Sequence, residues 1–347
     1  MNGSRAHWAR RTVLILIPLG VAANIALALA SPAFDWSRLP LMGLAGAVGL
    51  AILPWFVSAA RMVLWARFVG TSLRYVVALR VVLGGIVGSA VTPTGSGAGA
   101  IKWGLATRRG VSPGAAASLL AVEILEEAAF FAVALPIVAL TAATEVGALR
   151  ASLLDSGGDT LSRIAMSLTL GALGCLVLGG VWIGSLKGWL GPWLRRHARR
   201  VAVRLRQALL HPWEDAQSVL RDVARRGRGW LVVGLGLTAL QWGLRYSVAW
   251  AVLAAFEIRV PPLLSWALQW LTQTLAGLVP TPGGAGGAEG AFAVLYAAWV
   301  PIASLGLAVA AWRLALYYVP LLIASLLLAL PWATTHLPSH ENAAEQK

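Results

Sequence analysis

Long apolar runs divide the chain into segments of about the length that crosses a bilayer, which is roughly 20 residues for a helix. Two further apolar segments, 75–107 and 262–299, are each interrupted by glycine and proline, so that neither half makes a complete span. We interpret both as re-entrant helical hairpins, because non-helical backbone at membrane depth is tolerated only where protein buries it or water reaches it. Full spans are predicted at 12–31, 41–66, 112–140, 164–186, 229–256 and 303–331.

The two interruptions carry the same motif. Thr92–Gly99 recurs as Thr281–Ala288, and four of the eight aligned positions are identical. The shift between Pro93 and Pro282 is 189 residues. Paired Gly/Pro breaks at corresponding positions of two halves indicate a transporter-type site near the bilayer midplane.

Composition supports a membrane class. Hydrophobic residues make up 58% of the 347 residues and charged residues only 12%, against about 25% charged residues in a soluble domain. The predicted fold class is therefore an all-α polytopic membrane protein, with about six full spans plus two re-entrant helical hairpins. The single cysteine, Cys175, lies inside an apolar run and has no partner for an intrachain disulfide.

The distribution of basic residues predicts the orientation. With the N-terminus inside, the cytoplasmic segments hold twenty arginines and lysines, Arg61 and the eleven of 187–228 among them. The outside loops hold only Arg38, Arg150, Arg163 and Arg259. Cytoplasmic loops carry such an excess, so we expect a multi-pass protein of the cell (inner or plasma) membrane with a cytoplasmic N-terminus.

This orientation makes the two halves inverted-topology repeats, because the 41–66 span and its counterpart 189 residues later cross in opposite directions. The segment 187–228 alternates leucines and arginines as an amphipathic helix does, and we expect it to lie on an anionic leaflet rather than on nucleic acid. The predicted divisions are an N-terminal span (1–40), the first repeat (41–140), an external loop and span (141–186), the basic linker (187–228), the second repeat (229–331) and a polar tail (332–347).

Ionisable groups within apolar segments are costly and therefore candidates for function. Lys102 and Glu289 follow the two breaks, and Arg313 lies deep in the last span. We expect these three side chains to face one another or a shared lipid headgroup. The alternative to a binding role is that these charges form ion pairs that only hold helices together. Arg245 is a further ionisable group within an apolar segment, and its alternative is snorkelling to the membrane surface or pairing with a local group.

An anion would also be attracted by unwound backbone N–H groups and by the helix that begins after each break. Glu123 and Glu127, at i and i+4, share a helix face with Glu126 beside them. The predicted substrate-binding residues are Lys102, Glu123, Glu127, Glu289, Arg313, Pro93, Gly95, Gly97, Pro282, Gly284 and Gly286. We predict no catalytic residue, no metal ligand and no cofactor, since all five histidines fall outside the spans.

The motif Pro282–Gly290, with Arg313 and Pro320 downstream, resembles the flippase-like family, the membrane region of lysylphosphatidylglycerol synthase/flippase and its stand-alone relatives. The stretch Pro93–Lys102 and the acidic cluster that follows it match the first half of that family. The resemblance implies a protein that moves or handles lipids. The full-length synthase also has a soluble aminoacyl-transferring domain, and we do not expect that activity here.

Three functions follow from these patterns. The first is a flippase or transporter for an anionic or glycosylated envelope lipid, working by alternating access. The second is a non-transporting membrane subunit that recruits or regulates an envelope-lipid biosynthetic enzyme. An intramembrane transferase ranks last, because no loop outside 187–228 is long enough to bind a donor.

Overall fold

The computed structural model describes residues 39–92, 97–154, 227–279 and 283–330, together with Ala22, Ala26 and Leu29. Within these residues every regular element is a helix. The predicted spans 12–31 and 164–186, most of the linker 187–228, and the polar tail lie outside the described residues.

Each half contains four helical segments in the same order. The first half comprises α2 (Leu41–Phe68), α3 (Tyr75–Val91), α4 (Gly97–Thr107) and α5 (Pro113–Leu154). The second comprises α8 (Arg228–Ala255), α9 (Pro262–Leu278), α10 (Gly287–Tyr296) and a composite last helix. That last helix consists of α11 (Ile302–Arg313), a π-helical turn η2 (Leu314–Tyr318) and α12 (Val319–Ala329). Helices α2 and α8 both have 28 residues, and α3 and α9 both have 17.

The two broken segments form helical hairpins, as predicted. In the first, Thr92 joins the limbs, because its hydroxyl donates to Gly88 O and accepts from Gly97 N, both at 2.9 Å. In the second, the Tyr296 hydroxyl of α10 donates to Ser265 O of α9 at 2.9 Å. Both limbs of each hairpin therefore pack along one another, although neither limb is long enough to cross a bilayer.

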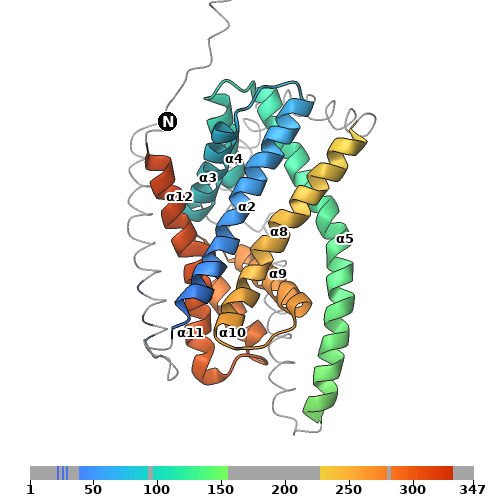
Figure 1. Cartoon of the computed structure of the whole chain (residues 1–347), viewed down its shortest axis with the longest axis vertical. Helices are drawn as coiled ribbons and strands as arrows, with labels where there is room; N and C mark the ends of the chain where they lie inside the picture. Colours follow the sequence, from blue (N-terminus) through green and yellow to red (C-terminus); the bar gives the residue numbers. More distant parts are fainter. Residues whose placement is uncertain are drawn as a thin grey trace, which may run out of the picture.

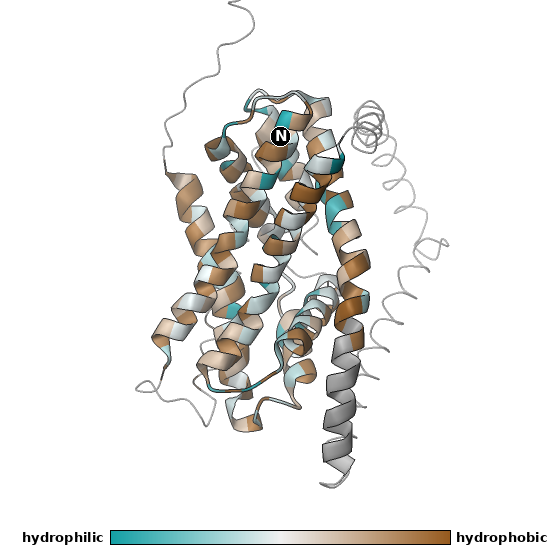
Figure 2. Cartoon of the chain, turned by 45° about the vertical axis from the view of Figure 1, so that its right-hand side comes forward, coloured by the Kyte–Doolittle hydropathy of each residue, from teal (hydrophilic) through white to brown (hydrophobic). Residues whose placement is uncertain are grey.

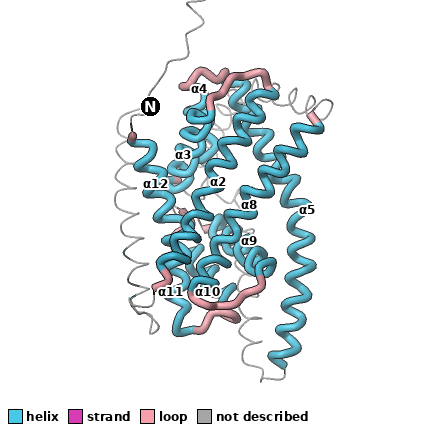
Figure 3. The backbone as a smooth tube through the Cα atoms, in the orientation of Figure 1, coloured by secondary structure: helices cyan, strands magenta, loops and turns pink. Residues whose placement is uncertain are grey.

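Helices α2 and α8 run antiparallel and make the most extensive helix–helix contact among the described elements. Gly43 at the start of α2 meets Ala255 at the end of α8, and Phe68 at the end of α2 contacts Trp230 at the start of α8. Figure 1 shows the two helices crossing the centre of the molecule, with the α3–α4 hairpin near one end and α9–α10 near the other. Figure 3 shows the connecting loops gathered at these two opposite ends.

Buried apolar residues form one main core in each half. The first-half core surrounds Trp65, Leu83 and Val122. The second-half core surrounds Phe292 and Trp312, whose rings stack at a centroid distance of 4.7 Å. Helix α2 contributes to both cores, so the two halves share a helix at their junction.

Large apolar side chains also remain on the outside. Ile124, Val133 and Leu140 of α5 are 66%, 64% and 71% exposed, and Figure 2 shows brown, apolar residues along most of the coloured helices. Apolar surface of this kind indicates contact with a membrane. Two helical stretches among the described residues have the length and mean hydropathy of a span, Leu41–Phe68 (1.9) and Ile302–Ala329 (1.7). The count of about six spans, and the inverted orientation of the repeats, remain predictions.

Two boundaries differ from the sequence interpretation. Helix α5 continues to Leu154, so the residues 141–154 assigned to an external loop are helical. This stretch is rich in alanine and leucine, which have the highest helix propensities. The span 303–331 contains the π-helical turn η2, directly after Arg313.

Candidate functional site

A buried arginine organises the polar residues of the first half. Arg61 of α2 has only 2% of its side chain exposed, and its Nη2 donates to Glu123 Oε1 at 2.9 Å and to Glu127 Oε1 at 3.1 Å. Its Nη1 donates to Thr238 Oγ1 of α8 at 2.6 Å. One guanidinium thus joins α2, α5 and α8. Such fixed, multiple hydrogen bonding suits the planar fork of arginine.

Lys102 of α4 joins this network through the same carboxylate. Its Nζ donates to Glu123 Oε1 at 2.7 Å. The lysine stem lies against α3, where a methyl group at Gly85 would be 2.8 Å from Lys102 Cε. Glycine at this position therefore lets the stem pass between the hairpin limbs, and the ammonium reaches α5. The ion pair attaches the second limb of the hairpin to the helix that follows it.

The third carboxylate, Glu126, has a different environment. Its side chain is fully buried, and Arg61 Nε lies 3.8 Å from Glu126 Oε2, beyond hydrogen-bond distance. Neither Glu126 oxygen has a hydrogen-bond partner among the described residues. The carboxylate is covered by α8 at Gly234, where a methyl group would overlap Glu126 Oε1.

The second half has its own ion pair. Arg313 donates through Nε to Glu289 Oε1 at 2.8 Å and through Nη2 to Glu289 Oε2 at 3.2 Å. This bidentate geometry gives strong, oriented pairing. The arginine is 3% exposed, and its guanidinium carbon lies 5.0 Å from the Tyr317 ring centroid.

The glycine-rich loop before α10 depends on this pair. Gly283 and Gly286 adopt φ values of +63° and +81°, a region that favours glycine. Arg313 Nη2 donates to Gly283 O at 3.2 Å, and Gly286 N donates to Glu289 Oε2 at 2.8 Å. Both ends of the described loop are thereby fixed to the Arg313–Glu289 pair.

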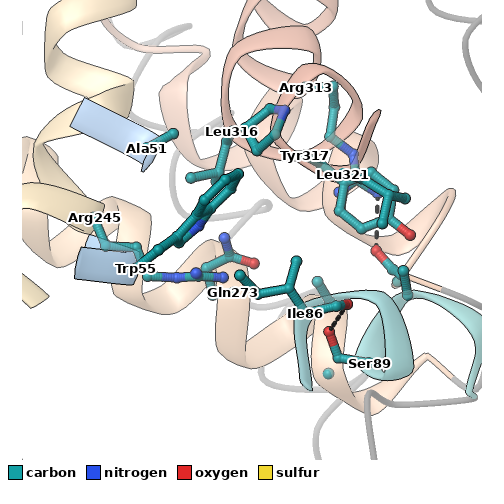
Figure 4. Close-up of a pocket in the computed structure, with 16 residues that line it drawn as sticks. Ala51, Trp55, Ile86, Ser89, Arg245, Gln273, Arg313, Leu316, Tyr317 and Leu321 are labelled. Carbon is teal, nitrogen blue, oxygen red and sulfur yellow. Dashed lines mark hydrogen bonds between the residues drawn. The ribbon is translucent and has the colours of Figure 1, made fainter. Parts of the chain in front are cut away.

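A cavity of about 250 Å³ lies between the halves. Figure 4 shows Arg245 of α8 entering it from one side, with Arg313 and Tyr317 on the opposite side. Arg245 has no carboxylate partner among the described residues and lies 5.9 Å from the Trp242 ring centroid. Since Glu289 balances Arg313, the cavity lining retains one positive charge, that of Arg245, which no carboxylate among the described residues balances. It is lined by residues of both halves, including Trp55, Ser89, Gln273, Gly283 and Gly284.

The structure divides the predicted site residues into two groups. Lys102, Glu123 and Glu127 meet around Arg61 in the first half. Glu289 and Arg313 meet in the second half, beside Gly284 and Gly286. Lys102 is therefore paired within its own half instead of with Glu289 or Arg313, because its hairpin packs on the following helix. Gly97 lies at the start of α4, and the remaining predicted residues, Pro93, Gly95 and Pro282, fall outside the described residues. Substrate binding by any of them remains a prediction.

Sequence reasoning missed Arg61, which was assigned to a cytoplasmic segment, yet it is buried within α2. Its position inside a strongly apolar segment was the available signal. Arg245 was among the candidate ionisable groups, with snorkelling or local pairing as the alternative. It lies over the ring of Trp242, three positions earlier, and it also lines the cavity. Among the described residues, no group of three or more His, Cys, Asp or Glu is placed to hold a metal ion.

In both halves an ion pair connects the second limb of the hairpin to the next helix, but the positions of the cation and the anion are exchanged. In the first half a lysine on the second hairpin limb pairs with a glutamate on the next helix. In the second half a glutamate on the second limb pairs with an arginine on the next helix. These helices and ion pairs, with apolar outer faces, define the class as an all-helical integral membrane protein.

Comparison with known families identifies the group. The family model described as the lysylphosphatidylglycerol synthase TM region matches residues 12–324, and the chain belongs to this family. A UPF0104 membrane protein of Archaeoglobus fulgidus is 24% identical over 271 residues, which cover 76% of this chain and 79% of that protein. The resemblance noted from the motif Pro282–Gly290 is thereby confirmed.

Proposed function

We propose that this protein is not an enzyme but a lipid flippase or transporter, which moves an anionic or glycosylated envelope lipid by alternating access. The observation that carries the proposal is the cavity, which is bounded by both halves and lined by Arg245 and Arg313. A positively charged cavity between two structurally similar halves suits the rocking of repeats around a central site.

The anionic class of substrate follows from the charges. Arg245 offers donors that no carboxylate among the described residues accepts, so a phosphate-containing headgroup would complete its hydrogen bonding. Ser89 and Gln273 add uncharged polar groups to the same lining, and such groups also suit hydroxyl-rich headgroups. The lipid would approach through the apolar outer surface, which suits contact with the acyl chains of a bilayer.

The test uses the full chain in phosphatidylcholine vesicles with a trace of fluorescent phosphatidylglycerol. Reduction of the outer-leaflet dye by dithionite reports movement between leaflets. The wild type should move the anionic lipid faster than fluorescent phosphatidylcholine. Arg245→Gln should slow this movement by roughly tenfold or more, because a hydrogen bond to a charged group contributes about 1.5–3 kcal/mol and 1.36 kcal/mol corresponds to tenfold in rate.

Arg259→Gln is the matched control, since Arg259 is an exposed arginine in the loop after α8, and this variant should keep the wild-type rate. If the wild type moves neither lipid, the transport proposal is wrong. The non-transporting membrane subunit then becomes the better interpretation, and the lipid-biosynthetic enzyme that it recruits should copurify with it.

A further inference from the structure

We propose that the Arg61 cluster is a proton-binding site in which Glu126 carries an exchangeable proton, and that this proton couples to the relative movement of the two halves. The binding of the proton stands on the geometry of the cluster alone. The coupling rests on the proposed function above.

The charges of the cluster do not balance unless one carboxyl group is protonated. Two cations, Arg61 and Lys102, face three carboxylates on α5. The hydrogen bonds of the cations go to Glu123 and Glu127, and these four groups together are neutral. Glu126 is left as the excess carboxyl group. A buried carboxylate without hydrogen bonds is very costly, and such a group takes up a proton instead.

Among the residues that the structure describes, no other charge around Glu126 would balance it. Arg61 and Trp65 face it from α2, and Gly234 covers it from α8. Glu123 and Glu127 flank it on α5, while Lys102 of α4 reaches only as far as Glu123. The indole Nε1 of Trp65 faces the carboxylate without meeting hydrogen-bond geometry, and it has no other partner among the described residues. A metal ion is the less suitable occupant, because it needs several oxygen ligands and would lie beside the Arg61 guanidinium.

The exposure of the cluster is graded. The Glu127 side chain is 29% exposed and the Glu126 side chain is fully buried, and the Arg61 guanidinium faces both. An arginine stays charged in proteins and does not relay a proton, so Glu126 exchanges its proton with water only where the packing around it opens. In that exchange the Glu126 carboxyl group releases a proton to water, or the carboxylate takes one up from water.

The location of Glu126 links its proton to conformational change. Arg61, Lys102 and the three glutamates belong to the first half, whereas Gly234 and Thr238 belong to the second. The burial of Glu126 therefore depends on how α8 lies against α5. When the halves move apart, water reaches the carboxyl group and the proton can leave. When they close, a charged Glu126 would be buried again, so closure favours the protonated form.

The first experiment detects the proton directly. Infrared difference spectra of the full chain in lipid nanodiscs, recorded during a pH titration, resolve the carbonyl stretch of a protonated carboxylic acid. The wild type should show such a band at neutral pH, and Glu126→Gln should lose it. Glu257→Gln alters an exposed glutamate in the loop after α8 and should keep the band. A band of equal size in the wild type and in Glu126→Gln would overturn the proton site.

A second variant keeps the test informative if Glu126→Gln does not fold. Gly234→Ala places a methyl group against Glu126 Oε1, and it should shift the frequency of the band. Gly236→Ala, on the same helix, adds a methyl group with no atom within 4 Å and should leave the band where it is. The same frequency in both alanine variants would contradict the assignment to Glu126.

The coupling is tested in vesicles with an imposed pH gradient. The wild-type rate of fluorescent phosphatidylglycerol movement should change with the gradient, whereas Glu126→Gln should lose this response. Lipid movement that ignores the gradient in the wild type would overturn the coupling but not the proposed function. If no lipid moves at all, the proposed function fails with the coupling, and the infrared band alone decides the proton site.

Discussion

Removal of the Arg61 side chain should destabilise the protein more than any exposed arginine does. Arg61→Met keeps the apolar stem of the side chain and deletes hydrogen bonds to Glu123, Glu127 and Thr238. Glu127 then stays against α2 without its counter-charge, and Glu123 keeps only Lys102. Removing one partner of a buried ion pair costs about 3–5 kcal/mol.

This magnitude can be measured as a shift in thermal unfolding. One kcal/mol corresponds to roughly 2–4 °C for 150–250 residues and to less for a larger protein. For this chain of 347 residues, a loss of about 3–5 kcal/mol should therefore lower the midpoint of Arg61→Met by roughly 5–10 °C. Scanning fluorimetry of the purified chain in detergent reports the midpoint through its tryptophans. Arg67→Met is the control, because Arg67 is exposed and lies less than two turns further along the same helix, and surface changes stay within about 0.5 kcal/mol.

The double variant Arg61→Met/Glu127→Gln separates lost charge balance from lost packing. Residues in one ion network show interaction energies of about 0.5–3 kcal/mol, so removing one unbalanced carboxylate should restore part of the midpoint. Equal midpoints for Arg61→Met and Arg67→Met would refute the structural role of the cluster. Additive losses in the double variant would refute the direct pairing.

Two further variants test single contacts in the second half. Gly286→Ala should lower the free energy of unfolding by about 1–2 kcal/mol, because the φ of Gly286 is +81° and a residue with a Cβ is strained there. Gly290→Ala is its control. Gly290 lies in helix α10 with open space around it, so this change should not be destabilising. Tyr296→Phe should lower the free energy of unfolding by about 1 kcal/mol, because the fully buried hydroxyl of Tyr296 donates to the α9 backbone. Tyr75→Phe is its control and should lower it less, because the hydrogen bond of the Tyr75 hydroxyl is exposed. Thermal midpoints measure all four, and a control that loses as much as its partner would contradict the local explanation.

Local patterns predicted the helices well. The Gly/Pro breaks placed both hairpins, because a proline in a helix removes a hydrogen bond and clashes with the preceding turn. The apolar runs 41–66 and 229–256 correspond closely to α2 and α8. The i, i+4 spacing of Glu123 and Glu127 correctly placed both on one face, since both accept from Arg61.

The pairing of distant charges could not be predicted in the same way. Arg61 lies near the end of an apolar run, where charge counting alone assigns it to the cytoplasmic side. Its true environment depends on glutamates more than sixty positions away in the sequence. The grouping of Lys102 likewise depends on which helix the hairpin packs against, and spacing along the chain carries no information about that.

A movement of one half against the other would affect the ion pairs within each half and the contacts between the halves differently. Lys102–Glu123 and Arg313–Glu289 each connect a hairpin with the next helix of the same half, so rocking of the halves would leave both pairs intact. The Arg61–Thr238 hydrogen bond and the contact of Glu126 with Gly234 cross between halves, so the same motion would break both. Among the described residues, Glu126 is a buried carboxyl group covered from the other half. If rocking of the halves opens the Arg245 cavity as proposed, this cover opens with it, and the protonation of Glu126 should respond to the conformation of the protein.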